Sequence, residues 1–210
     1  MNRILSPRDI LGEMRCVITD GHFVGPDYKH SSSFVDPPAA YSRTWHMDKL
    51  CESLSDYFDG DKVNAVVSLS PQGANLARST AHFLNKGRRQ RIATAYCDSD
   101  SIQAPIIKPL AGELVTGMKV LLVEGVLVQC GLVEKAVAGL QALGCRVIGL
   151  GAFCKRADVM CNVPKLISLV RLHHESWSAD ACPLCAQNVP VDTEVGLGRE
   201  FLASRHNQDE

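Results

Sequence analysis

Short runs of β-branched residues and leucine alternate along this chain with longer segments of helical periodicity. The runs expected to form buried strands span residues 63–69, 92–96, 120–124, 146–153 and 165–172. Apolar residues spaced three and four apart predict helices at 45–58, 74–84 and 132–143. Strands that alternate with helices of this length predict an α/β fold built on a parallel, doubly wound sheet.

The chain before these helices carries weaker signals. Ser6, Pro7 and Asp9 form a capping-box pattern that predicts a short helix ending near Met14. The glycine-containing segment 16–29 is expected to be strand or loop. Only the main run of strands and helices therefore fixes the fold class.

Residues 119–131, with the sequence K-V-L-L-V-E-G-V-L-V-Q-C-G, form the most informative stretch of the chain. A buried strand ends in Glu124, and a short loop leads to a helix expected to begin at Leu132. The backbone N–H groups and the dipole of a helix N-terminus bind anions. Doubly wound sheets bind ligands at the carboxyl ends of their strands. One crevice is therefore expected along the loops that follow Leu69, Tyr96, Glu124 and Phe153.

The same stretch resembles the phosphoribosyl-pyrophosphate loop of the type I phosphoribosyltransferases, whose usual form is V-V-E-D-V-x-T-T-G-G-S. The resemblance implies that ribose 5-phosphate is bound by Glu124, Gly125, Val128, Gln129, Cys130 and Gly131. Four of these positions depart from the family pattern. The second acid is Gly125, the two threonines are Val128 and Gln129, and the first glycine is Cys130.

Three further blocks resemble the orotate branch of this family and carry the likeness over roughly residues 21–156. The segment G-H-F-V-G-P-D-Y-K-H-S-S-S-F-V-D is similar to the hood that covers the base, which implies base binding by His30, Ser31 and Phe34. The segment V-V-S-L-S-P-Q-G is similar to the pyrophosphate loop, formed here by Ser70, Pro71, Gln72 and Gly73. The segment V-I-G-L-G-A-F-C-K-R places Arg156 where the family binds the orotate carboxylate.

The departures bear on the chemistry that the resemblance implies, which is substitution at the anomeric carbon of phosphoribosyl pyrophosphate. Half of the family's acidic pair is missing at Gly125. The loop expected to carry cations has Asp98 and Asp100 instead, with Lys108 as the nearby cation. The resemblance implies Glu124 and Lys108 as catalytic residues and Mg²⁺ as cofactor if the protein is active. The departures from the family pattern, in turn, imply transfer that is weak, altered or absent.

Composition and charge narrow the class of partner. The chain has 210 residues, of which 46% are hydrophobic, and 22 basic against 23 acidic residues give a formal net charge of −1. Without a strong basic field, neither nucleic acid nor an anionic membrane is an expected partner. No run approaches the length of a membrane span, and no apolar signal region opens the chain. Nine cysteines are then expected to be mostly reduced thiols in a cytoplasmic protein.

A separate signal lies near the end of the chain, where Cys182-Pro183-Leu184-Cys185 forms a C-x-x-C turn. Two thiolates at this spacing can bind one Zn²⁺, but a structural zinc site needs four ligands. The candidate partners are Cys154 and Cys161, or His173 and His174. The alternative is a tight turn with two unligated thiols.

Taken together, the sequence predicts a phosphoribosyltransferase-like domain over residues 1–175, whose hood occupies about residues 1–45. A Cys-x-x-Cys extension is expected over 176–202 and a disordered tail over 203–210. The expected ligand is a phosphoribosyl or nucleotide-like molecule. A non-catalytic regulatory or assembly partner, which uses the same crevice as a sensor or interface, is the alternative. A homodimer is expected, because Trp45 and Phe58 give the helix at 45–58 additional apolar surface unless both rings fill the core.

Overall fold

The computed structural model describes residues 5–25, 28–36, 38–86, 91–98, 106–173 and 175–206. The chain divides into two compact units. The α/β unit comprises Met1–Met14 and Pro37–Leu172, and the small unit comprises Arg15–Asp36 and His173–Glu210. The sequence-based division grouped residues 15–36 with the main domain. The structure instead joins them to the C-terminal segment by strand pairing.

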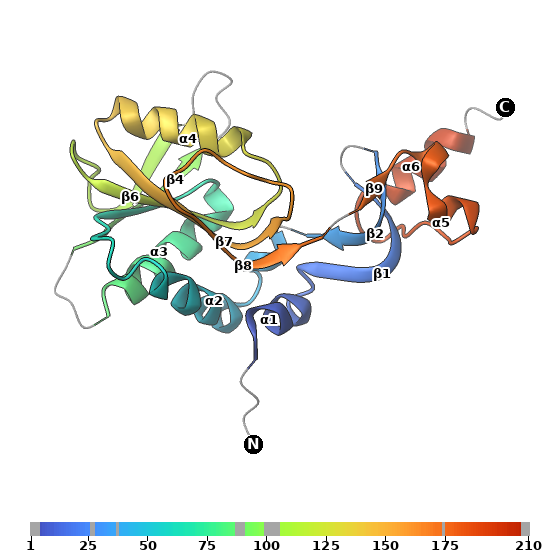
Figure 1. Ribbon diagram of the computed structural model, residues 1–210, viewed down its shortest axis with the longest axis horizontal. Helices are drawn as coiled ribbons and strands as arrows, with labels where there is room; N and C mark the ends of the chain where they lie inside the picture. Colours follow the sequence, from blue (N-terminus) through green and yellow to red (C-terminus); the bar gives the residue numbers. More distant parts are fainter. Residues whose placement is uncertain are drawn as a thin grey trace. The chain divides into compact units, whose positions relative to one another are not determined.

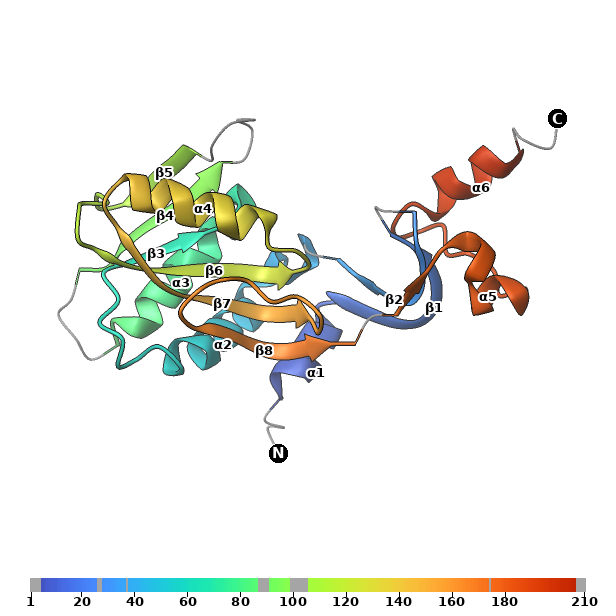
Figure 2. The same cartoon turned by 45° about the horizontal axis from the view of Figure 1, so that its top comes forward.

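The α/β unit is built on a six-stranded sheet with the order β5-β4-β3-β6-β7-β8 (Figures 1 and 2). Its strands are β3 (Ala65–Ser68), β4 (Ala93–Asp98), β5 (Ile106–Ala111), β6 (Lys119–Leu127), β7 (Arg146–Arg156) and β8 (Leu166–Leu172). All neighbouring pairs are parallel except β4 and β5. The predicted parallel sheet is confirmed, with one antiparallel strand added at its edge.

Helices cover both faces of this sheet. Figures 1 and 2 show α2 (Thr44–Asp56) and α3 (Ala74–Leu84) on one face and α4 (Gly131–Ala142) on the other. Helix α1 (Pro7–Glu13) contacts α2 and β8. Two short 3₁₀ helices, η1 (Pro38–Tyr41) and η2 (Pro71–Gly73), contact each other and β6. This arrangement is the doubly wound fold that the sequence predicted.

Local signals account for several boundaries. The capping box is present at the start of α1, where the Ser6 hydroxyl accepts from the Asp9 backbone and the Asp9 carboxylate accepts from the Ser6 backbone. Gly144, after α4, has φ of +74°, as expected of a residue that ends a helix. Strand β5 was not expected from the sequence, since Pro109 disfavours a strand. An edge strand tolerates proline because one side of its backbone needs no partner.

Strands β6 and β7 each continue three residues past their expected ends, to Leu127 and Arg156. The two strands stay paired over this extension, with Val126 opposite Cys154 and Leu127 opposite Lys155. The residues that the sequence assigned to the start of the phosphate loop are therefore part of a buried strand. The loop itself is reduced to residues 128–130.

The small unit has a three-stranded antiparallel sheet with the order β1-β2-β9. Its elements are β1 (Val17–Val24), β2 (His30–Val35), β9 (Ser176–Trp177), η3 (Ala179–Ala181), α5 (Pro183–Ala186) and α6 (Gly198–His206). Helix α6 corrects the expected disordered tail as far as residue 206, because Phe201 packs edge-on against His30 at 4.6 Å and so holds this helix to the sheet. Residues 207–210 lie outside the described part of the chain.

In the ranges that the structure describes, no helix has both the length and the apolar character needed to cross a bilayer.

Candidate functional site

Glu124 is the acid that the sequence assigned to ribose binding, and it lies in the buried central strand β6. The residue is only 9% exposed. The Tyr41 hydroxyl donates a hydrogen bond to Glu124 Oε1, and the Gly125 N–H donates to the same oxygen at 2.8 Å. Burial raises the pKa of the Glu124 carboxyl, and these two hydrogen bonds offset part of that rise. The acid is therefore already occupied by groups of its own chain.

Tyr41, the last residue of η1, provides the side chain that binds the Glu124 carboxylate. Burial raises the pKa of the Tyr41 hydroxyl, and the charge of Glu124 raises it further, so this phenol stays protonated. The same hydroxyl accepts from the Gly125 N–H at 3.1 Å and is hydrogen-bonded to the Ser70 side chain. Tyr41 thus joins η1 to both predicted ligand loops.

The position of the family's second acid is filled by the same tyrosine. A Cβ placed on Gly125 would lie 2.9 Å from Tyr41 Oη and 3.0 Å from Ala40 Cβ. Side-chain carbons essentially never approach other atoms this closely. Any side chain at position 125 would therefore have to displace Tyr41 or Ala40 of η1. No motif in the sequence marks Tyr41, and the only hint was the glycine in place of an acid.

The predicted pyrophosphate loop follows directly from β3. Ser70 precedes η2, and the Ser68 hydroxyl donates to the Ser70 carbonyl at 2.7 Å. Gly73 packs against Ser68, where an added Cβ would lie 2.9 Å from Ser68 Cβ. Pro71 and Gln72 lie between them in η2. The structure therefore brings this loop, Glu124 and Gly125 together at the carboxyl edge of the sheet.

The predicted phosphate loop leads into α4, which begins at Gly131 after Cys130. Val128 and Gln129 are exposed, and no side chain caps the helix. The first backbone N–H groups of a helix have no partner within the helix, so an uncapped start can hold an anion. The donors at this position are backbone groups and the Gln129 amide, because Val128 has no polar side-chain atom.

A disulfide joins Cys130 to Cys161, with their Cα atoms 5.3 Å apart. It ties the start of α4 to the segment that follows β7. This bond corrects two expectations: the pair is not reduced, and Cys161 is not available as a metal ligand. Cys154, the other candidate, is buried in β7, and its thiol contacts the Gly125 carbonyl at 3.8 Å.

The two predicted cations each pair with a nearby carboxylate. Lys108 of β5 forms an ion pair with Asp98 at the end of β4. Arg156 Nε lies 2.7 Å from Asp158 Oδ1, and this hydrogen bond lowers the pKa of Asp158. Asp100 lies outside the described residues. Catalysis by Lys108 and orotate binding by Arg156 stay predictions.

The predicted base-binding residues belong to the small unit, on β2. His30 is fully buried, and its Nδ1 lies 2.7 Å from His22 Nε2. The Ser31 hydroxyl donates to the Ser33 carbonyl at 2.6 Å. The ring of Phe34 packs 5.9 Å from that of Phe23, measured between centroids. Their role in base binding stays a prediction.

Cys182 and Cys185 lie beside His22 and His30 in the same unit. The sequence analysis identified the two cysteines, but it assigned His30 to the base and did not single out His22. Two histidines eight residues apart, together with a C-x-x-C turn, were the available signal. Of the other proposed partners, His173 is not part of this group, and His174 lies outside the described residues.

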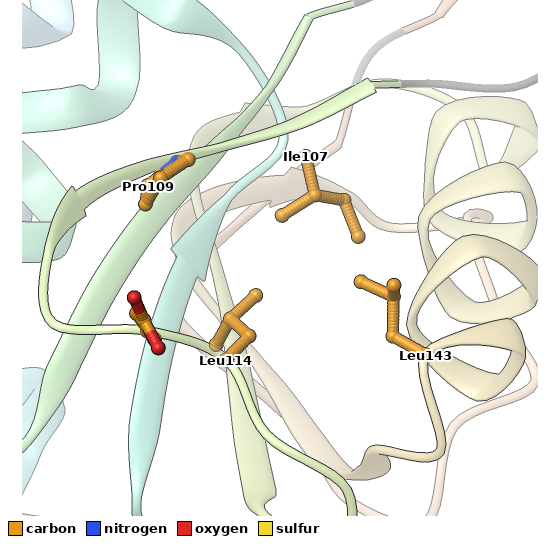
Figure 3. Close-up of a pocket in the computed structure, with 5 residues that line it drawn as sticks. Ile107, Pro109, Leu114 and Leu143 are labelled. Atoms are coloured by element: carbon orange, nitrogen blue, oxygen red, sulfur yellow. The ribbon is translucent and has the colours of Figure 1, made fainter.

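A separate pocket of about 270 Å³ lies between β5, the segment after it and the end of α4. Figure 3 shows Ile107, Leu114 and Leu143 directed into it, with Pro109 at its side. The pocket is therefore mainly apolar. None of the sequence-predicted site residues lines it.

The relatives found by sequence and by structure belong to the same class of protein. No family model matches the chain. It is 26% identical over 178 residues to orotate phosphoribosyltransferase of Caldanaerobacter subterraneus, covering 83% of this chain and 88% of the relative. It is 27% identical to orotate phosphoribosyltransferase of Thermus thermophilus, covering 83% and 92%. The crystal structure of the Mycobacterium tuberculosis orotate phosphoribosyltransferase superposes with a TM-score of 0.60 at 16% identity, over 79% of this chain and 96% of that one.

The fold is that of a type I phosphoribosyltransferase-like protein. Within that class the chain is orotate phosphoribosyltransferase-like, as its four motif blocks predicted.

Proposed function

We propose that this protein binds a phosphoribosyl or nucleotide-like ligand at the carboxyl edge of its α/β sheet, with weak, altered or absent transfer of ribose 5-phosphate to a pyrimidine-like base. The relatives named above support the ligand class. The contact of Tyr41 with Glu124 and Gly125 supports the weak, altered or absent transfer. This contact fills the place where the family holds the ribose hydroxyls.

The proposed ligand is anchored mainly through its phosphates. The uncapped start of α4 offers backbone N–H groups to a 5′-phosphate. The loop Ser70–Gly73 offers a hydroxyl, an amide and backbone donors to a pyrophosphate or a second phosphate. These donors are largely independent of the missing threonines. Binding can therefore persist where the contacts needed for transfer are reduced.

Glu124, within β6, fits poorly as a Mg²⁺ site of its own. Magnesium prefers exposed carboxylates and keeps several waters. Here the one acid, Glu124, is buried and accepts hydrogen bonds from Tyr41 and Gly125. Mg²⁺ bound at Glu124 is therefore not part of the proposed function. The loss of one ribose contact costs a few kcal/mol in the transition state, or about a hundredfold or more in rate.

Calorimetric titration with phosphoribosyl pyrophosphate and Mg²⁺ tests the proposed site. Gln129→Glu adds a negative charge beside the start of α4 and should weaken binding at least about tenfold, since a like charge there opposes the phosphate. Gln141→Glu makes the same change at the exposed far end of α4 and should leave binding unchanged. Equal effects of the two variants, or no binding by the folded wild type, would overturn the proposal.

One observation favours the alternative of a non-catalytic partner protein. Val128 and Leu132, each two positions from Cys130, are 41% and 38% exposed, and Met160, which precedes Cys161, is 77% exposed. The disulfide brings these two short segments together, so apolar side chains gather where a phosphate would bind. In a thermal-shift panel of phosphoribosyl pyrophosphate, orotate, pyrimidine nucleotides and Mg²⁺, silence throughout would favour this alternative.

A homodimer and a cytoplasmic location remain part of the proposal. The exposed ring of Trp45 on α2 supports the dimer, since 57% of this residue is accessible. Phe58, by contrast, is 1% exposed and packs within the α/β unit. Only one of the two aromatic residues that suggested additional apolar surface is therefore available for a partner.

A further inference from the structure

Two imidazoles and two thiols converge in the small unit, from segments at opposite ends of the chain. His22 lies on β1, His30 on β2, and Cys182 and Cys185 at the start and within α5. The potential ligand atoms of these four residues all lie within 4.8 Å of one another. Four nitrogen and sulfur donors are the composition of a closed structural zinc site.

The distances between these atoms match the edges of a zinc tetrahedron. Bonds of about 2.3 Å to sulfur and 2.0–2.1 Å to nitrogen imply sulfur–nitrogen edges of about 3.5 Å. The observed separations are 3.6 Å from Cys182 Sγ to His22 Nε2, 3.7 Å from Cys185 Sγ to His22 Nε2, and 3.4 Å from Cys185 Sγ to His30 Nδ1. The His22–His30 edge, 2.7 Å, is shorter than the roughly 3.3 Å expected and has to open slightly around an ion.

The surroundings orient the histidines for this role. His22 Nδ1 lies 2.7 Å from the Val189 carbonyl, which can only accept, so Nδ1 carries the proton. The lone pair of His22 is then on Nε2, the atom that faces the two thiols. Such a bond from the second ring nitrogen to a carbonyl is the usual support of a metal-bound histidine.

The four potential ligands are largely shielded from solvent. His22, His30 and Cys182 are each 3% exposed or less, and Cys185 is half-buried. Cys182 and Cys185 are not joined by a disulfide, although their C-x-x-C turn places both thiols in the group. Four donors leave no open position for a substrate. The ion in such a site stabilises the fold and does not take part in catalysis.

We propose that the small unit binds one structural Zn²⁺ through His22 Nε2, His30 Nδ1 and the thiolates of Cys182 and Cys185, a role that replaces the predicted contact of His30 with the base. Binding releases the two thiol protons, and His30 carries its proton on Nε2. The ion fastens β1 and β2 to α5, which is separated from them by the whole α/β unit in sequence. A unit made of two short segments has little core of its own, so a metal at this position supplies stability that packing alone does not.

Metal analysis of the full chain, purified without chelator, tests this site. Wild type should contain about one equivalent of zinc per chain. Cys182→Ser and His22→Gln each remove a direct ligand. Each should weaken zinc binding by more than the roughly 10–100-fold that follows loss of a residue that only hydrogen-bonds a ligand. Cys145→Ser removes a buried thiol in the α/β unit and should retain the full equivalent.

A second measurement uses wild-type protein and therefore does not require the variants to fold. Wild-type protein stripped by chelator should lose amide-exchange protection in β1, β2 and α5, and Zn²⁺ but not Mg²⁺ should restore it. Co²⁺ added to the stripped protein should give the visible absorption of a tetrahedral thiolate site. Wild type that contains no zinc and takes up neither ion would overturn the proposal, as would zinc retained in full by both ligand variants.

Discussion

Replacing Gly125 with aspartate restores the family's second acid and directly tests whether Tyr41 fills its place. The added Cβ would lie 2.9 Å from Tyr41 Oη and 3.0 Å from Tyr41 Cζ, so the tyrosine has to move. Overpacking of this kind costs about 1–3 kcal/mol. Movement of Tyr41 also removes its hydrogen bond to the buried Glu124, which contributes about 1–3 kcal/mol more.

We therefore expect Gly125→Asp to lower the free energy of unfolding by at least about 2 kcal/mol. Urea denaturation at neutral pH measures this change. Gly125→Ala, which adds the Cβ without a charge, separates the steric cost from charge repulsion by Glu124. Gly60→Asp is the matched control, since nothing lies within 4 Å of a Cβ at that exposed position.

The decisive comparison is a double-mutant cycle with Tyr41→Ala. In that background the space beside Gly125 is open, so Gly125→Asp should cost at least about 1 kcal/mol less than in wild type. The double variant should also bind phosphoribosyl pyrophosphate with Mg²⁺ more tightly than either single variant, because only there are both acids accessible. Additive effects of the two substitutions, or a wild-type background that tolerates aspartate, would refute the proposed role of Tyr41.

Three further predictions follow from the same contacts. Burial raises the folded-state pKa of Glu124, so the native state binds the extra proton and stability should fall as pH rises from about 4.5 through that raised pKa. Glu124→Gln should lack this loss of stability. An unchanged pH profile of the melting temperature would contradict this prediction. Cys161→Ser opens a loop with a sequence separation of 31 and should lower the free energy of unfolding by up to about 3–4 kcal/mol without reductant. With reductant present, the variant and wild type should be equally stable. A wild type insensitive to reductant would argue against the bond with Cys130. Light scattering should give wild type a mass of twice the 22.8 kDa chain and Trp45→Glu the mass of one chain, whereas a monomeric wild type would exclude the dimer.

The parallel sheet could be predicted from the sequence because its strands are buried on both faces and therefore appear as continuous apolar runs. The capping box at Ser6 and the glycine after α4 likewise act through neighbouring residues, which a sequence shows directly. Strand β5 was missed because its pairing with β4 is a tertiary contact and Pro109 obscures it.

The site was predictable only in part, for the same reason. Ser68 at the end of β3 pairs with Val123, so the loop at Ser70 begins beside Glu124 and their meeting follows from the parallel pairing of β3 and β6. Tyr41 reaches them from a segment more than 80 positions away in sequence from Glu124, and no local pattern marks that contact. His22 was missed because its partners, Cys182 and Cys185, come from the other end of the chain.

Pyrophosphate release under single-turnover conditions is the most direct test of the proposed function. Protein in excess is mixed with phosphoribosyl pyrophosphate, orotate and Mg²⁺, with binding followed in parallel by calorimetry. Because Tyr41 occupies the acid that the family uses for ribose, we expect bound ligand with release at least about a hundredfold slower than by an orotate phosphoribosyltransferase assayed alongside. Release at the rate of that enzyme would show that Tyr41 leaves the site during turnover, and it would contradict the proposed loss of transfer.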